Sequence, residues 1–166
     1  MIDKQTVLDS MLKEIACIRH LCGKVQPGTE NWRPTEGQRS VIELLRYLTH
    51  CGFNAVKAAV TTDWDSARAR VESAGKLTLN DIPAALDAQA GELRRLFAEI
   101  PSGDFLGRQV ARPGQEPMPL ARFLLDSAFK YLPAYKMQLF LYLKQQVVPN
   151  LATANLWRGH DAQPAK

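Results

Sequence analysis

Residues 131–144 read YLPAYKMQLFLYLK. This segment contains Tyr131, Tyr135 and Tyr142, with Gln138 between them, and successive members of the set are four, three and four residues apart. That spacing puts all four side chains on one face of an α-helix. A helix face that points inward usually carries aliphatic side chains, whereas a buried phenol or amide needs a hydrogen-bond partner. We call these four residues the tyrosine stripe and expect either a pocket or a polar core beside it.

Four helices are predicted from the periodicity of apolar residues along the chain. Their approximate ranges are 6–24, 41–60, 80–100 and 119–147. The second begins at a capping box, in which Ser40 and Glu43 satisfy each other's backbone amides. The connection 61–79 should hold a short helical turn, and residues 104–119 should form a loop or a small hairpin turning at Pro113-Gly114. The fold class is therefore all-α, a four-helix bundle.

The length of 166 residues predicts one domain, with the bundle at 1–149 and a C-terminal tail at 150–166. The net charge of +4 comes with no long cluster of Lys and Arg, so we expect no nucleic-acid partner. The apolar runs are shorter than a membrane span, and we expect no membrane partner. The three cysteines form no CxxC pair, and the first residues do not resemble a secretory signal, which favours reduced thiols and a cytoplasmic location.

The predicted fourth helix has two unusual features. Pro133 lies in its interior, where it removes one backbone hydrogen bond and should bend the helix between Tyr131 and Tyr135. The back of the helix is also apolar, which indicates burial on two sides. A homodimer through this helix is our first explanation, and a C-terminal tail folded over the back face by way of Trp157 is the alternative.

Two segments resemble a known family. Residues 40–48, SVIELLRYL, are similar to the pattern S-x-x-E-x-x-x-H-L, and residues 131–144 are similar to H-x-x-x-H-R-G-Q-L followed by Y-L-R. Both patterns belong to the DinB/YfiT-like family of four-helix bundle proteins, and the resemblance covers most of the chain. It implies a site between the second and fourth helices.

Members of that family typically bind a divalent metal, often nickel or zinc, through three histidines, one on the second helix and two on the fourth. The matching positions here are Tyr47, Tyr131 and Tyr135. An imidazole offers a neutral nitrogen lone pair, whereas a phenol must first lose its proton. We therefore expect a degenerate metal site with no metal and no cofactor, in which the hydroxyls bond to one another, to Gln138 and to water.

The sequence leaves three functions open. The first is a metal-free bundle that binds a small molecule or serves as an interaction module, with the tyrosine stripe and Tyr47 lining the site. The second is a DinB-family thiol-dependent transferase or hydrolase-like enzyme that uses tyrosine as an acid or base, or a metal site of another kind. The third is a bundle whose ancestral site is filled. We expect Cys51 to be a buried structural thiol and His50 to lie at the surface or at a subunit interface.

Overall fold

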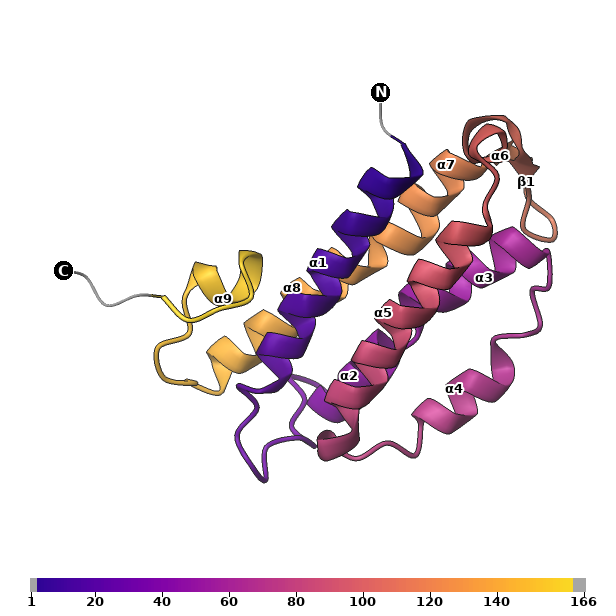
Figure 1. Ribbon diagram of the computed structural model, residues 1–166. Coiled ribbons are helices and arrows are strands. Elements are labelled where there is room, and N and C mark those ends of the chain that lie inside the picture. The colour runs from indigo at the N-terminus through magenta and orange to yellow at the C-terminus, as the bar shows by residue number, and fades with distance from the viewer. Residues whose placement is uncertain (1–2, 163–166) are drawn as a thin grey trace.

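Four helical rods, two of them interrupted, pack side by side around a common apolar core (Figure 1). A computed structural model describes residues 3–162 of the chain. The rods are α1 (Lys4–Cys22), the pair α2 (Val41–Leu48) and α3 (Cys51–Thr61), α5 (Ile82–Glu99), and the series α7 (Leu120–Phe123), η2 (Leu124–Phe129) and α8 (Tyr131–Gln145). The predicted all-α bundle is confirmed.

Both helices that begin the first two rods have side-chain caps. The Asp3 carboxylate accepts a hydrogen bond of 2.8 Å from the amide of Thr6 at the start of α1. Ser40 and Glu43 form the predicted capping box at the start of α2, with bonds of 3.3 and 2.7 Å. These caps satisfy amides that a helix leaves without partners in its first turn. α2 begins where its capping box predicted, and α1 begins at Lys4, slightly before the expected start near residue 6.

The second rod is interrupted, although the sequence predicted one helix over 41–60. α2 ends at Leu48 and α3 begins at Cys51. The fully buried Gln89 of α5 spans the interruption: its amide donates to the Leu48 carbonyl at 2.9 Å and accepts from the Phe53 amide at 3.2 Å. A residue from another rod therefore satisfies the backbone groups that the break exposes, which no local pattern in residues 41–60 could reveal.

The fourth rod departs from a regular helix one turn earlier than expected. Its irregular part is the π-helical segment η2, in which the Lys130 amide donates to the Leu125 carbonyl five residues back. Pro133 follows in the first turn of α8 and cannot donate to the carbonyl of Phe129, the last residue of η2. The change in helix type therefore precedes both tyrosines, and the bend expected between Tyr131 and Tyr135 stays a prediction.

Short elements connect the rods. They are α4 (Arg68–Ala74), η1 (Leu79–Asp81), α6 (Ser102–Gly107), β1 (Gln109–Val110) and β2 (Met118–Pro119). The two strands pair antiparallel and form the predicted small hairpin. Its turn has Pro113 followed by Gly114 at φ +76°, with the Gln115 amide bonded to the Arg112 carbonyl, as a type II turn requires. α6 was not predicted.

The C-terminal segment folds back onto the bundle. Its helix α9 (Thr153–Trp157) packs against α1 and α8, and Leu156 is buried there. Beneath it the fully buried Lys136 ammonium lies 2.6 Å from the Glu14 carboxylate and 4.7 Å from the centre of the Trp157 ring. This part of the back of α8 is thus covered by the chain itself, as the alternative to a dimer predicted.

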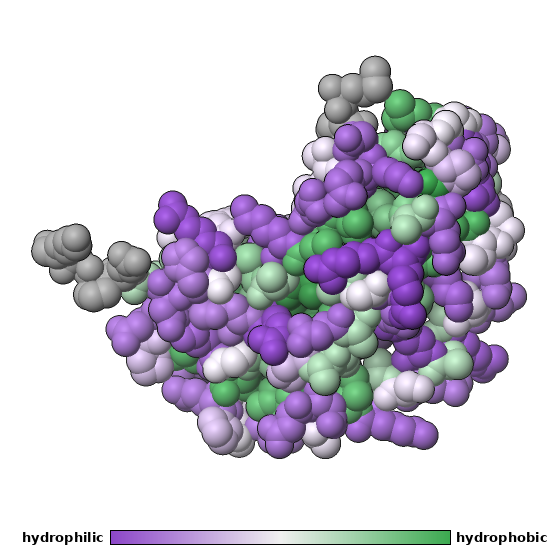
Figure 2. Space-filling model, in the orientation of Figure 1, coloured by the Kyte–Doolittle hydropathy of each residue, from purple (hydrophilic) through white to green (hydrophobic). Residues whose placement is uncertain are grey.

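The molecular surface in the same orientation is mainly hydrophilic, with hydrophobic residues visible in patches between the helices (Figure 2). Within residues 3–162, none of the helices combines the length and the apolar character needed to cross a bilayer.

Candidate functional site

Three phenol rings meet between α2 and α8. Tyr47 of α2 and Tyr135 of α8 are 4.8 Å apart at their ring centres and pack edge to face. Tyr131, one turn before Tyr135, lies 6.4 Å from it. The structure therefore brings together the three tyrosines that the sequence placed at the candidate site. All three are half-buried, so each ring has one side against the bundle and one toward solvent.

The guanidinium of Arg39 completes this cluster, although no sequence pattern pointed to this residue. Its carbon lies 4.4 Å from the centre of the Tyr47 ring and 5.6 Å from that of Tyr135. A guanidinium over the electron-rich face of a phenol is a favourable cation–π contact. Arg39 comes immediately before the Ser40 cap, so the start of α2 fixes where its side chain leaves the backbone. We call Arg39, Tyr47, Tyr131 and Tyr135 the phenol–arginine cluster.

His50 extends the cluster from the break between α2 and α3. Its ring lies 5.4 Å from that of Tyr47, and its Nδ1 is 3.2 Å from the side-chain amide of Asn54. The expected surface position is wrong, since His50 is only 7% exposed. Burial lowers the pKa of His50 to about 4, and the positive charges of Arg70 and Arg39 add to this effect. The imidazole is therefore neutral at physiological pH.

A cavity of about 390 Å³ opens beside the cluster, between α2 and α4. Its walls come from Arg39, Glu43, Arg46, Tyr47, His50, Val71, Ala74 and Gly75. Tyr47 is thus the only member of the three phenols that faces this cavity, and Tyr131 and Tyr135 lie behind it in the cluster. A volume of this size is within the range of small-molecule sites.

The other half of the tyrosine stripe is closed. The Gln138 amide donates to the Tyr142 hydroxyl at 2.6 Å, and the Trp32 ring meets the Tyr142 ring edge to face at 5.4 Å. Tyr142 is buried, with 3% of its surface exposed. Gln138 and Tyr142, which the sequence grouped with the site, therefore form a satisfied polar contact in the core, anchored by the loop before α2.

The cluster does not suit the divalent metal that the resemblance implies. A phenol must be deprotonated to bind a metal well, and burial raises the pKa of Tyr47 far above its ordinary value. The neighbouring Cys51, Tyr135 and Tyr131 raise that pKa further, and Arg39 only partly offsets them. The Arg39 guanidinium also holds a positive charge over two of the rings, where it would repel a cation. Elsewhere in residues 3–162, no three His, Cys, Asp or Glu side chains converge as metal ligands would.

The thiol next to the cluster, Cys51, does not favour nucleophilic chemistry either. Cys51 is buried, and burial raises the pKa of its thiol to about 12, so the reactive thiolate is not populated at neutral pH. The raised pKa of Tyr47 makes this phenol a weaker acid than free tyrosine. The geometry thus favours binding through ring faces and cations over acid–base or thiol chemistry.

The fold has a counterpart among solved structures. The crystal structure of a DinB-like protein, YjoA, from Bacillus subtilis superposes with a TM-score of 0.66, covering 96% of this chain and 95% of that one at 14% sequence identity. No protein-family model matches the sequence, and neither does any curated protein. An identity of 14% shows the fold alone. The structural likeness nevertheless confirms what the segments 40–48 and 131–144 led us to expect: the chain has the fold of a DinB-like protein.

Proposed function

We propose that this protein is a metal-free DinB-like bundle that binds a small anionic aromatic molecule in the cavity beside Tyr47. The observation that carries the proposal is the Arg39 guanidinium, which lies over the rings of Tyr47 and Tyr135 and lines the cavity. In this position an organic cation of the chain itself takes the electrostatic role that a metal ion would have in such a bundle. An anion bound here would pair directly with Arg39, whereas at a metal ion it would first have to displace a bound ligand.

The charges around the cavity support an anionic ligand. Arg39 and Arg46 both line it, and Glu43 is the one acidic residue among its walls. The Glu43 carboxylate is already engaged, since it accepts from the Ser40 amide at 2.7 Å and pairs with Arg33 at 3.2 Å. Neutral His50 adds no charge. The walls are therefore net positive, which favours a carboxylate over a cation.

The remaining walls support an aromatic body for the ligand. The Tyr47 ring offers a flat face, and Val71 and Ala74 of α4 add aliphatic surface opposite it. Aromatic rings pair favourably with one another in edge or offset geometries, and a guanidinium stacks on such rings as well. A single ring with a carboxylate matches the size and the chemistry of the cavity.

The test is a titration of the purified full chain with benzoate, followed by the NMR shifts of backbone amides. We expect saturable shifts at Tyr47 and Ala74, and weaker binding of benzamide, which has the same shape without the charge. Arg39→Ala should weaken benzoate binding by roughly tenfold, since about 1.4 kcal/mol corresponds to that factor. The control Arg68→Ala, at an exposed position, should bind as the parent does. Equal binding of benzoate and benzamide would refute the proposed ligand class.

The metal-free part of the proposal has its own test. Protein purified without chelator should contain no stoichiometric divalent metal by elemental analysis. A triple variant, Tyr47→His with Tyr131→His and Tyr135→His, should gain nickel or zinc binding if the cluster occupies the family's metal position. Stoichiometric metal in the parent protein would overturn the metal-free assignment.

We also propose a homodimer through α8. The tail covers only part of the back of this helix. Leu141 remains 51% exposed, and Trp157 at the edge of the tail is 49% exposed. Exposed apolar side chains of this size support association with a second copy. Light scattering should give a dimer at micromolar concentration, Leu141→Glu should give a monomer, and Val71→Glu on the distant α4 should leave the dimer intact. A monomeric parent protein would contradict the proposal.

A further inference from the structure

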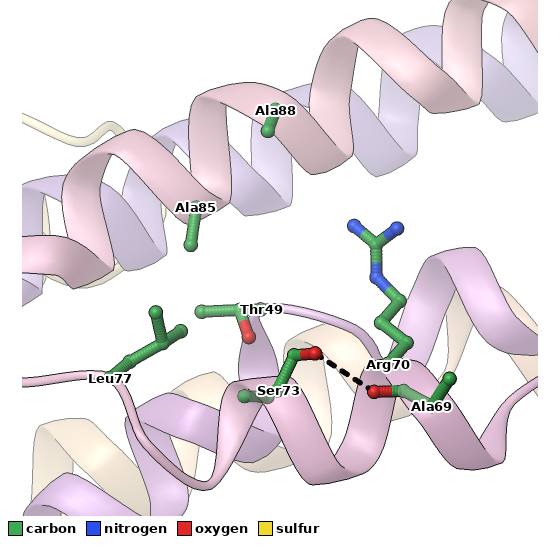
Figure 3. A pocket seen from close by; sticks show the side chains of 8 residues that line it. Thr49, Ala69, Arg70, Ser73, Leu77, Ala85 and Ala88 are labelled. Carbon is green, nitrogen blue, oxygen red and sulfur yellow. Dashed lines mark hydrogen bonds between the residues drawn. The ribbon is translucent and has the colours of Figure 1, made fainter.

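A second cavity, which shares only Ala74 with the one beside Tyr47, lies between α4 and α5 (Figure 3). Its volume is about 380 Å³. It is open to solvent on one side, since Ala69, Ser73 and Ala88 in its walls are exposed. Small side chains leave it unfilled: Ala85 and Ala88 of α5 face Ala69 and Ala74 of α4, where larger aliphatic residues would occupy the space.

The cavity is almost entirely apolar, and its few polar side chains are mostly occupied. The Ser73 hydroxyl donates to the Ala69 carbonyl at 3.0 Å, as the dashed line in Figure 3 shows. The Thr49 hydroxyl donates to the Arg46 carbonyl at 2.6 Å. Neither hydroxyl proton is therefore available to a ligand. A molecule in this cavity would contact methyl groups on most of its surface.

Arg70 is the exception, and it is held in a fixed position. Its side chain points from α4 toward α5 (Figure 3), its Nη2 lies 2.5 Å from the Glu92 carboxylate, and its guanidinium carbon lies 4.1 Å from the centre of the Phe53 ring. A guanidinium has five N–H donors, and the contact with Glu92 uses the Nη2 edge. The remaining donors, already oriented by Phe53 and Glu92, can serve a ligand at the end of the cavity.

We infer that the α4–α5 cavity binds a small, flat, uncharged aromatic molecule that carries one hydrogen-bond-accepting oxygen directed at Arg70. The apolar walls select the aromatic body, and the spare donors of Arg70 select the oxygen. The molecule is uncharged because Glu92 already neutralises Arg70, so a carboxylate would be desolvated without an unpaired cation to receive it. This chemistry differs from that of the cavity beside Tyr47, where Arg39 and Arg46 favour an anion.

The probe for this site is 2-naphthol, with 2-naphthoate as its charged counterpart and naphthalene as its counterpart without oxygen. We expect 2-naphthol to shift the backbone amides of Ala85 and Ala88 saturably in NMR spectra of the full chain. It should bind more tightly than either counterpart. Failure of 2-naphthol to shift these amides, or tighter binding of 2-naphthoate at them, would overturn the inference.

Variants separate this site from general association with apolar surface. Ala85→Leu fills the cavity and should weaken 2-naphthol binding by roughly tenfold, whereas Ala84→Leu, the same change at the exposed neighbouring position, should leave it unchanged. Arg70→Met should remove the preference for 2-naphthol over naphthalene while naphthalene still binds, which also shows that the cavity is intact. Equal binding by the Ala85 and Ala84 variants would refute the assigned position. Neither variant alters Arg39, so benzoate binding beside Tyr47 reports on the proposed function independently.

Discussion

Tyr135 and Lys136 are adjacent in the chain but lie on two sides of α8, where polar groups are in opposite environments. Lys136 is fully buried, paired with Glu14 and covered by Trp157 of the tail. Tyr135 is half-buried in the phenol–arginine cluster, and Tyr47 beside it borders a cavity. The closed side pairs its charged group within the chain, whereas the open side leaves a cationic, ring-lined surface for another molecule.

This contrast between the two sides of α8 indicates which substitutions should affect folding and which should affect function. A buried ion pair is costly to desolvate and contributes little net stability, but it becomes strongly destabilising when one partner is removed. A half-buried aromatic cluster can lose a member at small cost. We therefore expect substitutions on the closed side to affect folding and substitutions on the open side to affect binding.

The largest effect should come from Glu14→Gln on the closed side. This change leaves the Lys136 ammonium buried without an opposite charge, and the free energy of unfolding should fall by about 3–5 kcal/mol. Urea denaturation measures it. The double variant Glu14→Leu with Lys136→Met removes both charges and should be more stable than Glu14→Gln alone. A loss below about 1 kcal/mol in the single variant would show that the pair is not desolvated as the structure indicates.

Gln89→Leu should have the next largest effect, because Gln89 bonds to the backbone on both sides of the break between α2 and α3. The Leu48 carbonyl and the Phe53 amide would each lose a buried partner, at about 1–3 kcal/mol per group. Hydrogen exchange at the Phe53 amide should accelerate together with the loss of stability. Gln115→Leu in the exposed hairpin is the control and should change neither quantity. Unchanged protection at Phe53 would rule out the bridging role of Gln89.

A pH dependence should follow from His50. Its pKa is near 4 in the folded protein and about 6.5 when exposed, so the unfolded chain binds the proton more tightly. The contribution of His50 to the free energy of unfolding is fully present above about pH 6.5 and is lost as the pH falls toward 4. The loss should be roughly 1–3 kcal/mol after allowance for solvent screening. His50→Gln should lack this component in chemical denaturation at several pH values, whereas His160→Gln should retain it. Parallel pH profiles of the parent and His50→Gln would contradict the neutral, buried imidazole.

The smallest effect on stability should come from Arg39→Ala, at about 0.5–1 kcal/mol, the usual strength of an exposed cation–π contact. The near-ultraviolet circular dichroism of the tyrosines should change, because the guanidinium no longer orders the rings of Tyr47 and Tyr135. Arg68→Ala removes an exposed charge elsewhere and should leave this spectrum as it is. A large loss of stability in Arg39→Ala would assign Arg39 to folding and weaken the contrast between the two sides of α8.

Sequence patterns predicted the elements whose signals are local. The Ser40–Glu43 capping box, the Pro113-Gly114 turn and the periodicity of the rods depend on residues within a few positions of one another. The structure has the cap, the turn and four rods, although the second rod is broken after Leu48. The meeting of Tyr47 with Tyr131 and Tyr135 also followed, because the resemblance placed their two helices side by side. That resemblance was more informative than periodicity for this long-range contact.

The missed features depend on contacts between distant segments. The break after Leu48 is stabilised by Gln89, which lies 41 residues farther along the chain. Arg39 joins the cluster because its guanidinium lies over two phenol rings. The burial of Lys136 depends on the packing of α9, whose Trp157 covers the ammonium. His50 was expected at the surface or at a subunit interface because residues 41–60 were treated as one continuous helix, whereas His50 lies in the break between α2 and α3. In each case tertiary packing, which no periodicity encodes, decided the environment of the side chain.

The π-helical segment η2 adds a consequence for how such proteins vary. A turn of π-helix holds more residues than a turn of α-helix, and each residue of an α-helix advances the chain by about 100° around its axis. Converting 124–129 to regular α-helix without changing the number of residues would therefore turn the whole of α8 by about that angle relative to the preceding residues. Tyr135 would leave the cluster and another face would replace it. A single-residue deletion accompanied by the same change of helix type would instead preserve the orientation of α8, so this segment can absorb a change in length while the cluster and the bundle around it stay in place.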